Sequence, residues 1–486
     1  MTTHIPLRCI ALFSLILSVT FIAAFSQAHE HSSNTNLDPE IDKRFEQLSA
    51  FVNKEMTEKT VPGVAIGVLF NGEHRTRAFG ITNINNPQLV TDKTLFQIGS
   101  ITKTMTGTIM MRLAEQGKLD LDANVRQYLP NFKVKDEQVS ANVKVRDLLT
   151  HMSGWVGDHF STKAGAGDDA LSRILAEMTE LEQLAPLNSV YSYNNSAFYV
   201  AAHIIEVVTK DTIQNVMQSM IFDDIGMHDS YIVPSDVMTK PYVVGHNNAA
   251  KGISVAQRWA LYRAAWAAGG GIMTAGDMLK YAAFHLGDGT NSDGDQVMQQ
   301  ASLLAMQATQ AAKVGTKDAI GITWHLSSVG NLKVVTHGGA TNGQQAYLLL
   351  IPEKDFAITV LTNAGNGRAL HQKVIAFALE QYFDARNPEP ILQTRTHQEL
   401  VEYAGLYSRP FRDLKITVVD GQLMIQAIPK QSFLGNEIAP PSPLRAFNFF
   451  ETDRIVDKSG NFKAEFIRNE DGSIGWIRSS RIFVKQ

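Results

Sequence analysis

The feature that most constrains the fold is a hydrophobic periodicity that changes twice between residues 41 and 386. Runs with strand-like composition lie at both ends of this stretch, at residues 64–81 and 332–361, and the residues between them are mostly helical in pattern. Strands far apart in the sequence must then pair in one antiparallel sheet, with the helical residues inserted as a separate lobe. This predicts an α+β fold, an antiparallel sheet flanked by helices with an inserted all-helical lobe. A cleft between sheet and lobe is the natural place for a site.

Local signals place the individual elements. Asn71-Gly72 separates two strand-like runs, as in a two-residue hairpin. Thr274 and Asp277 have the spacing of a capping box at the start of a helix. Further strands are predicted at residues 332–336, 346–351 and 356–361, and helices at 41–54, 99–116, 197–208, 212–222, 278–286 and 369–383.

The composition changes beyond residue 386. Asn387-Pro388-Glu389-Pro390 is typical of a stiff linker, and the pairs Asp420-Gly421 and Asp471-Gly472 each lie between β-rich runs. Short strands at this spacing predict a small antiparallel β-barrel or sandwich over residues 387–486. We therefore expect a main domain at 41–386 and a C-terminal β-barrel-like domain at 387–486.

The first residues have the pattern of a secretory signal. Arg8 is followed by an apolar run at residues 9–25 and by Ser26-Gln27-Ala28, which offers small residues at a cleavage site. We expect a signal peptide at 1–28, a linker at 29–40 and a periplasmic or secreted protein; an uncleaved anchor is the alternative. The only cysteine, Cys9, would leave with the signal.

Composition excludes several classes of protein. The net charge is −4 over 486 residues, which excludes the strongly basic surface typical of nucleic-acid binding. A single cysteine excludes a disulfide framework and a cysteine-rich metal site. After the signal, no stretch reaches the roughly 18 apolar residues that a membrane span needs. The expected partner is a small molecule or a short peptide.

The first candidate for chemistry is Ser100-Ile101-Thr102-Lys103, at a predicted strand-to-helix corner. Ser and Lys three residues apart lie on one helix face. A neutral amine there can take the serine proton, and the positive end of the helix dipole favours both a neutral lysine and an oxyanion. Alone, the motif is weak, because on the order of one S-x-x-K is expected by chance in a chain of this length.

Two later segments can complete such a site. Tyr193, in a stretch that we expect to begin a helix, can carry a proton, and the Asn195 amide can hold a substrate carbonyl. His337-Gly338-Gly339 is predicted to end a strand, where glycines let a substrate backbone approach. Taken singly, each segment also fits a structural role: a buried tyrosine, a helix cap or a glycine turn.

Together these segments resemble the serine β-lactamase and penicillin-binding-protein superfamily, in its class-C-like branch. The ordered set Ser100-x-x-Lys103, Tyr193-x-Asn195 and His337-x-Gly339 carries the resemblance over roughly residues 40–385. The stretches LLTHMSG (148–154), GGGIMTAGD (269–277) and HGGATNGQQAYLLLIPE (337–353) support it. The residues after 386 look like the β-barrel that trails many members.

The resemblance implies a role for each matched residue. Ser100 would be the acylated nucleophile, with Lys103 and Tyr193 as the acid–base pair. Substrate would be held by Asn195, His337, Gly339 and a backbone oxyanion hole made by the N–H groups of Ser100 and Ala340. His151 would shape a loop rather than react. The resemblance implies no cofactor and no metal.

The third motif departs from that of the antibiotic-hydrolysing members, which have Lys-Thr-Gly where this chain has His337-Gly338-Gly339. Histidine is mostly neutral at pH 7 and cannot replace a fixed cation. The resemblance then favours a serine hydrolase of ester or amide bonds, including D-amino-acid peptides. The alternatives are a β-lactamase or D-Ala-D-Ala carboxypeptidase, an inactive penicillin-recognising protein, and a scaffold whose barrel recruits a partner. Substrate and oligomeric state stay open.

Overall fold

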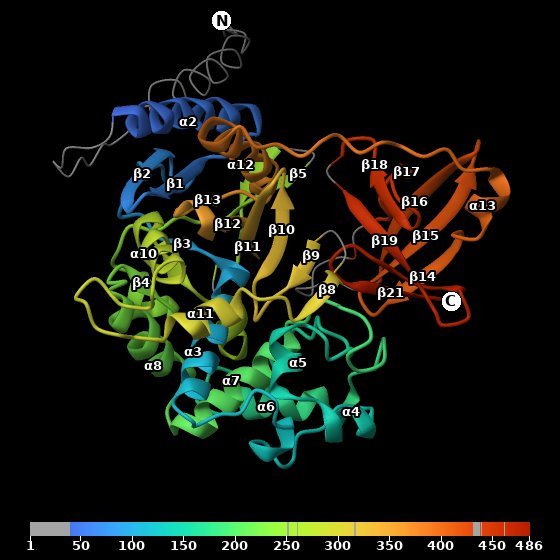
Figure 1. The fold of residues 1–486 in the computed structure, drawn as a ribbon, viewed down its shortest axis with the longest axis horizontal. Coiled ribbons are helices and arrows are strands. Elements are labelled where there is room, and N and C mark those ends of the chain that lie inside the picture. The colour runs from blue at the N-terminus through green and yellow to red at the C-terminus, as the bar shows by residue number, and fades with distance from the viewer. Residues whose placement is uncertain are drawn as a thin grey trace, which may run out of the picture.

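An eight-stranded antiparallel sheet forms the centre of the larger part of the molecule (Figure 1). The computed structural model describes residues 39–249, 252–259, 261–314, 317–430, 438, 440–460 and 462–486, so the predicted signal peptide and most of the predicted linker lie outside it. The strand order is β2-β1-β13-β12-β11-β10-β9-β8. The strands are β1 (Gly63–Phe70), β2 (Glu73–Gly80), β8 (Ala311–Val314), β9 (Lys317–Ile320), β10 (His325–Val329), β11 (Leu332–Thr341), β12 (Gln344–Ile351) and β13 (Phe356–Thr362).

Pairing between distant segments confirms the predicted sheet. β1 pairs with β13 from Val64 opposite Thr362 to Phe70 opposite Phe356. The β1–β2 hairpin turns at Asn71 and Gly72, which both have positive φ, as a tight hairpin turn requires. The N-terminal hairpin is thus joined to the C-terminal strands, and most of the residues between β2 and β8 form a lobe beside the sheet.

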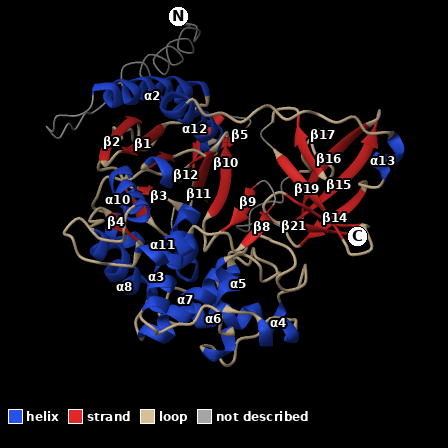
Figure 2. Ribbon diagram, viewed as in Figure 1, coloured by secondary structure: helices blue, strands red, loops and turns tan. Residues whose placement is uncertain are grey.

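Helices cover both faces of the sheet (Figure 2). α2 (Pro39–Glu58) and α12 (Gly367–Phe383) pack together on one face, where they bury an apolar cluster that includes Leu48 and Leu370. α10 (Ala275–Leu286) packs on β1 and β13 from the other face, and Thr274 accepts a hydrogen bond from the Asp277 N–H at its start. Each face therefore has its own hydrophobic core.

The predicted helical lobe is built around α3 (Thr102–Glu115), which is buried on nearly every side. The other helices of this region are α4 (Glu137–Asn142), α5 (Val145–Leu149), α6 (Ala170–Glu177), α7 (Ser196–Thr209), α8 (Ile213–Met217), α9 (Trp266–Gly269) and α11 (Gln300–Met306). Two small sheets accompany them, β3 (Phe96–Gln97) with β7 (Ile272–Met273) and β4 (Ser230–Tyr231), and β5 (His246–Ala249) with β6 (Gly252–Val255). Within the described ranges, every helix is too short or too polar to cross a membrane.

Two predictions near the candidate site were wrong in detail. β11 does not end at Thr336, because its pairing with β12 continues through Gly339 opposite Ala346 to Thr341. The glycines lack β propensity, but the backbone hydrogen bonds of a central strand compensate. Residues 191–194 do not begin a helix; they lie outside any helix or strand, and α7 starts at Ser196.

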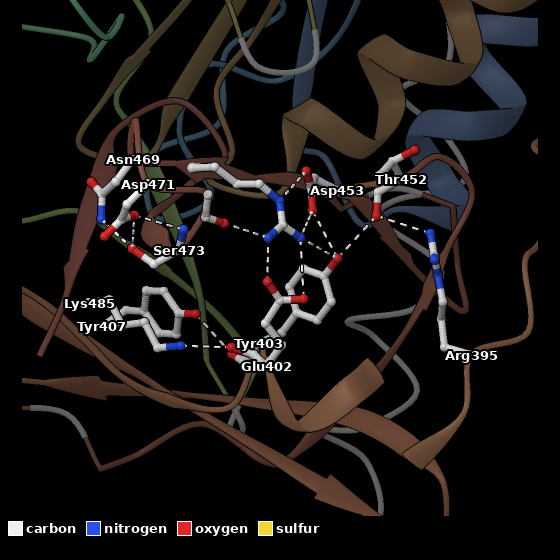
Figure 3. Close-up of polar contacts among 12 residues, drawn as sticks. Arg395, Glu402, Tyr403, Tyr407, Thr452, Asp453, Asn469, Asp471, Ser473 and Lys485 are labelled. Atoms are coloured by element: carbon white, nitrogen blue, oxygen red, sulfur yellow. Dashed lines mark hydrogen bonds and ion pairs between the residues drawn. The ribbon is translucent and has the colours of Figure 1, made fainter. Parts of the chain in front are cut away.

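The C-terminal residues form a closed eight-stranded barrel. The sequence left a barrel or a sandwich open, and the barrel is confirmed. Asp420-Gly421 and Asp471-Gly472 make hairpin turns as predicted. The strands are β14 (Gly405–Arg409), β15 (Arg412–Val419), β16 (Gln422–Pro429), β17 (Arg445–Phe449), β18 (Arg454–Asp457), β19 (Lys463–Arg468), β20 (Ile474–Arg478) and β21 (Ile482–Lys485). α13 (His397–Val401) precedes them, and Figure 3 shows how Tyr403, just after it, reaches Asp453 with its hydroxyl, 2.9 Å away.

The barrel packs against the sheet-and-lobe part. Trp476 donates its indole N–H to the carbonyl of Leu184 at 2.9 Å, and Ile482 is buried against Ala185 and Val190. A cavity of about 370 Å³ remains between the two parts, lined in part by Tyr191.

Candidate active site

Ser100 lies at a strand-to-helix corner, as predicted. β3 leads into a single 3₁₀ turn, Gly99–Ile101, and α3 follows directly. Gly99 has φ +52°, and a side chain there would begin 2.5 Å from the backbone nitrogen of Ala340. The corner is therefore pressed against β11, and only glycine fits at this contact.

Lys103 points back along α3 toward the serine. Its Nζ lies 3.3 Å from the Ser100 Oγ and donates to the Ala268 carbonyl at 2.5 Å. The Nζ also lies 5.1 Å from the ring centre of Tyr193 and 5.2 Å from that of Phe198. Within the described residues it makes no ion pair with a carboxylate. The amine is held in place by neutral groups.

Burial decides the charge of Lys103. The residue is 0% exposed, and this loss of water holds its pKa well below the usual value of 10.5. The Arg481 guanidinium lowers the pKa further, whereas the Asp158 carboxylate opposes both effects. A neutral amine beside a serine hydroxyl is a proton acceptor.

Tyr193 packs beside the same amine from the segment that precedes α7. Burial raises the pKa of its phenol to about 12, against the opposing effect of the Ser100 hydroxyl, so the phenol keeps its proton at neutral pH. The His151 ring packs on it with 4.3 Å between ring centres, and the His151 Nδ1 accepts the N–H of Asn194. His151 has a positive φ of 59°. Burial is the main reason that its pKa lies well below the usual value of 6.5. These contacts fit the loop-shaping role expected of it.

Asn195 immediately precedes α7 and is tied to a buried acid. Its Nδ2 donates to the Asp158 Oδ1 at 2.9 Å, which leaves its second N–H for another acceptor. Burial raises the pKa of Asp158, but Arg481 and Arg409 outweigh burial and hold it below its usual range. Asp158 is thus a carboxylate at neutral pH.

β11 forms the third wall. A side chain at Gly339 would begin 1.8 Å from the carbonyl oxygen of Ile98 and 3.0 Å from the Ser100 nitrogen. This contact brings the Ala340 peptide next to that of Ser100. His337 is 1% exposed, donates its Nδ1–H to the Gly338 carbonyl at 2.8 Å, and stacks on His325 with 5.0 Å between ring centres.

The structure brings all the predicted site residues to one place and adds three that the sequence did not reveal. Asp158 lies in a loop without a motif, His325 lies on β10, and Arg481 comes from the barrel. No periodicity or spacing links any of them to Ser100. Within the described ranges, no three His, Cys, Asp or Glu side chains gather as metal ligands do.

Comparisons with known proteins identify the family. The profile of the Beta-lactamase family matches residues 42–382, which is most of the sheet-and-lobe part. The chain belongs to the β-lactamase family. It is 30% identical to Penicillin-binding protein 4 of Amycolatopsis lactamdurans over 362 residues, 73% of this chain and 94% of that protein.

Solved structures agree on the fold of this β-lactamase-family chain. SurE has a TM-score of 0.74 at 22% identity, and the likeness covers 92% of this chain and all of SurE. A class C β-lactamase has a TM-score of 0.60 at 21% identity, over 73% of this chain and 99% of the other. The part of this chain that the class C β-lactamase covers, 73%, is close in extent to the residues 42–382 that the family profile matches.

A first prediction concerns the contact between β11 and the corner. Gly339→Ala should lose nearly all turnover and destabilise the protein by about 1 to 3 kcal/mol, because the new methyl group meets backbone that cannot easily move aside. Gly338→Ala is the matched control, since its methyl group would make ordinary contacts, with the Tyr347 ring edge at 3.4 Å and the Ala346 carbonyl oxygen at 3.8 Å. Urea unfolding and ester hydrolysis measure both effects. Equal behaviour of the two variants would contradict the geometry.

A second prediction concerns the protonation of Lys103. Arginine cannot lose its proton at working pH, so Lys103→Arg should lower kcat/KM by about 10²- to 10⁴-fold at every pH. In the native enzyme, kcat/KM should rise with pH through the pKa of Lys103, which lies below 10.5, since only the neutral amine accepts a proton. Lys93→Arg, at an exposed lysine paired with Asp229, is the control. Full activity of Lys103→Arg would rule out a proton-accepting lysine.

Proposed function

We propose that this protein is a serine hydrolase that cleaves ester or amide bonds through an acyl-enzyme on Ser100. The observation that carries the proposal is the fully buried amine of Lys103, whose pKa burial holds well below its usual value, at 3.3 Å from the Ser100 hydroxyl. Nothing in the packing of the helix requires a lysine at this position, because burying an amine costs free energy that an apolar side chain would not. The Beta-lactamase family profile supports the reaction class.

The proposed acylation uses three groups. Lys103 takes the proton of the Ser100 hydroxyl as the Oγ bonds to the substrate carbonyl carbon. The resulting oxyanion accepts hydrogen bonds from the backbone N–H groups of Ser100 and Ala340, an arrangement typically worth about 3 kcal/mol for each donor. Tyr193, whose phenol keeps its proton, then donates to the departing alcohol or amine as the carbonyl re-forms.

Water completes the cycle. A water molecule attacks the acyl carbon and gives one proton to the deprotonated Tyr193. The protonated Lys103 returns its proton to the Ser100 Oγ as the bond between Oγ and the acyl carbon breaks. Asn195 would hold the substrate amide or ester oxygen with the N–H that Asp158 does not use. His337 and Gly339 would line the edge along which the acyl part lies.

The substrate class is proposed from the third motif and the relatives. A histidine in place of the lysine cation favours small esters, amides and D-amino-acid peptides over β-lactams. SurE has also been solved with D-Leu, and a relative from Aspergillus violaceofuscus, 25% identical over 63% of this chain and 58% of that protein, is called Unguisins hydrolase ungD. The D-Leu in the SurE structure supports including D-residue amides among the substrates tested, and the second name supports a hydrolase.

The test is a panel of short p-nitrophenyl esters, D-alanyl anilides and nitrocefin against native enzyme and Ser100→Ala. We expect turnover of an ester or an anilide by the native enzyme, loss of at least about 10⁴-fold in Ser100→Ala, and a mass increase of one acyl group on Ser100 after rapid quenching. Ser235→Ala, at an exposed turn outside the site, is the matched control and should keep native turnover. Undiminished hydrolysis by Ser100→Ala would end the proposal.

A second candidate is a penicillin-recognising protein without turnover. The likeness to Penicillin-binding protein 4 favours it. A fluorescent penicillin would then acylate Ser100 and stay bound, while the panel of esters, anilides and nitrocefin remains intact.

We also propose that the protein is exported to the periplasm or secreted, on the basis of the signal pattern at residues 1–28. N-terminal sequencing of the exported protein should begin at His29. A start at Met1 would favour the uncleaved anchor instead.

A further inference from the structure

The segment that carries Tyr193 is hydrogen-bonded to the barrel at three consecutive residues. The Tyr191 carbonyl accepts from Arg478 at 3.1 Å, the Ser192 hydroxyl accepts from the N–H of Ile482 at 3.4 Å, and the Tyr193 N–H donates to the Ser480 carbonyl at 2.9 Å. The partners come from the end of β20, the turn after it and the start of β21. This irregular segment therefore takes part of its hydrogen bonding from the barrel.

Side chains continue the same contact into the site. Arg481, in that turn, binds Asp158 with two nitrogens, Nη2 to Oδ1 at 2.9 Å and Nε to Oδ2 at 2.5 Å. The Asp158 Oδ1 also accepts from Asn195, and Oδ2 accepts from Arg409 of β14 at 3.1 Å. The Arg481 guanidinium lies 4.9 Å from the centre of the Tyr193 ring.

This arrangement is more than a packing contact between two parts. Asp158 is 5% exposed in its side chain, and a carboxylate so placed needs its partners. Two of them, Arg481 and Arg409, come from the barrel, and the third is the candidate substrate-binding amide of Asn195. A change in the barrel at Arg481 must therefore be felt at Asn195 and Tyr193 together.

We propose that Arg481 is a positioning residue of the active site, through which the barrel holds Tyr193 and Asn195 in place against Ser100. The inference rests on the hydrolase proposed above and extends it, because it makes the barrel part of the site. It departs from the alternative of a scaffold role, in which the barrel could be removed without loss of hydrolysis.

The pair also acts on Lys103 by charge. Arg481 favours the neutral amine and Asp158 the protonated one. The titratable or charged groups that surround the lysine and the pair include Tyr193, Tyr191, Tyr199, Tyr262, His151, His325, His337, Arg409 and Arg478. Arg481 and Asp158 also act on the pKa of Tyr193 and Arg409, and Arg481 acts on that of His151, so the shift of the Lys103 pKa is read against the native enzyme in each variant. Removal of Arg481 should then raise the pKa of Lys103, and removal of Asp158 should lower it. Loss of packing alone would not give shifts of opposite sign.

The experiment compares full-length Arg481→Met, Arg481→Lys and Asp158→Asn with the native enzyme. In Arg481→Met, kcat/KM for the best ester should fall about 10- to 100-fold, and the acidic limb of its pH profile should move to higher pH. In Asp158→Asn the limb should move to lower pH. Arg481→Lys keeps the charge and should keep the native limb with a smaller loss of rate. Arg445→Met, on β17 and paired within the barrel to Asp457, should match the native enzyme.

Hydrogen exchange gives a readout that does not depend on catalysis. In Arg481→Met the N–H groups of residues 192–195 should exchange at least about tenfold faster than in the native protein, and in Arg445→Met they should not. Native exchange at these residues in Arg481→Met, with native kinetics, would overturn the inference. If instead Ser100→Ala keeps its hydrolysis, the proposed function fails, and the exchange rates still decide whether Arg481 positions Tyr193.

Discussion

The arrangement rests on one interaction, the contact between a dehydrated lysine amine and a serine hydroxyl. Lys103 has no carboxylate partner among the described residues, and its two hydrogen-bond partners are neutral oxygens, the Ser100 Oγ and the Ala268 carbonyl. A charged amine in this place would lack compensation, so the folded protein favours the neutral form. The same burial that costs free energy on folding makes the amine a base at ordinary pH. The rings of Tyr193 and Phe198 pack beside this fully buried nitrogen.

Close contact between backbones sets the position of the serine. The corner at Gly99 and the strand at Gly339 approach each other so closely that neither position has room for a methyl group. This contact joins residues far apart in the sequence, as does the pairing of β1 with β13 in the sheet. The long-range pairing of the sheet is therefore what aligns the Ser100 and Ala340 peptides. A chain that misplaced β11 by one residue would keep its motifs and lose the site.

Periodicity and turn chemistry were enough to predict the sheet, the hairpin at Asn71-Gly72 and the C-terminal barrel, because these depend on patterns a few residues long. The candidate residues were predicted because their motifs are short and lie in a fixed order. The extension of β11 through Gly338 and Gly339 was not predicted, because pairing with β12, and not the β propensity of these residues, maintains it. Nor was the pair of Arg481 with Asp158, whose members lie 323 residues apart and belong to no pattern.

The pair between Asp158 and Arg481 links the two parts of the molecule through charge as well as contact. Arg481 lowers the pKa of Lys103 and Asp158 raises it. If the two charges cancelled, burial alone would set the shift of that pKa. Arg409 adds a second guanidinium to the same carboxylate, which gives the cluster one surplus positive charge. Within this cluster it is Arg481 that disfavours a further cation nearby and thus favours the neutral lysine. Because both guanidiniums come from the barrel, its seating against the lobe sets the electrostatic environment in which the proposed base works.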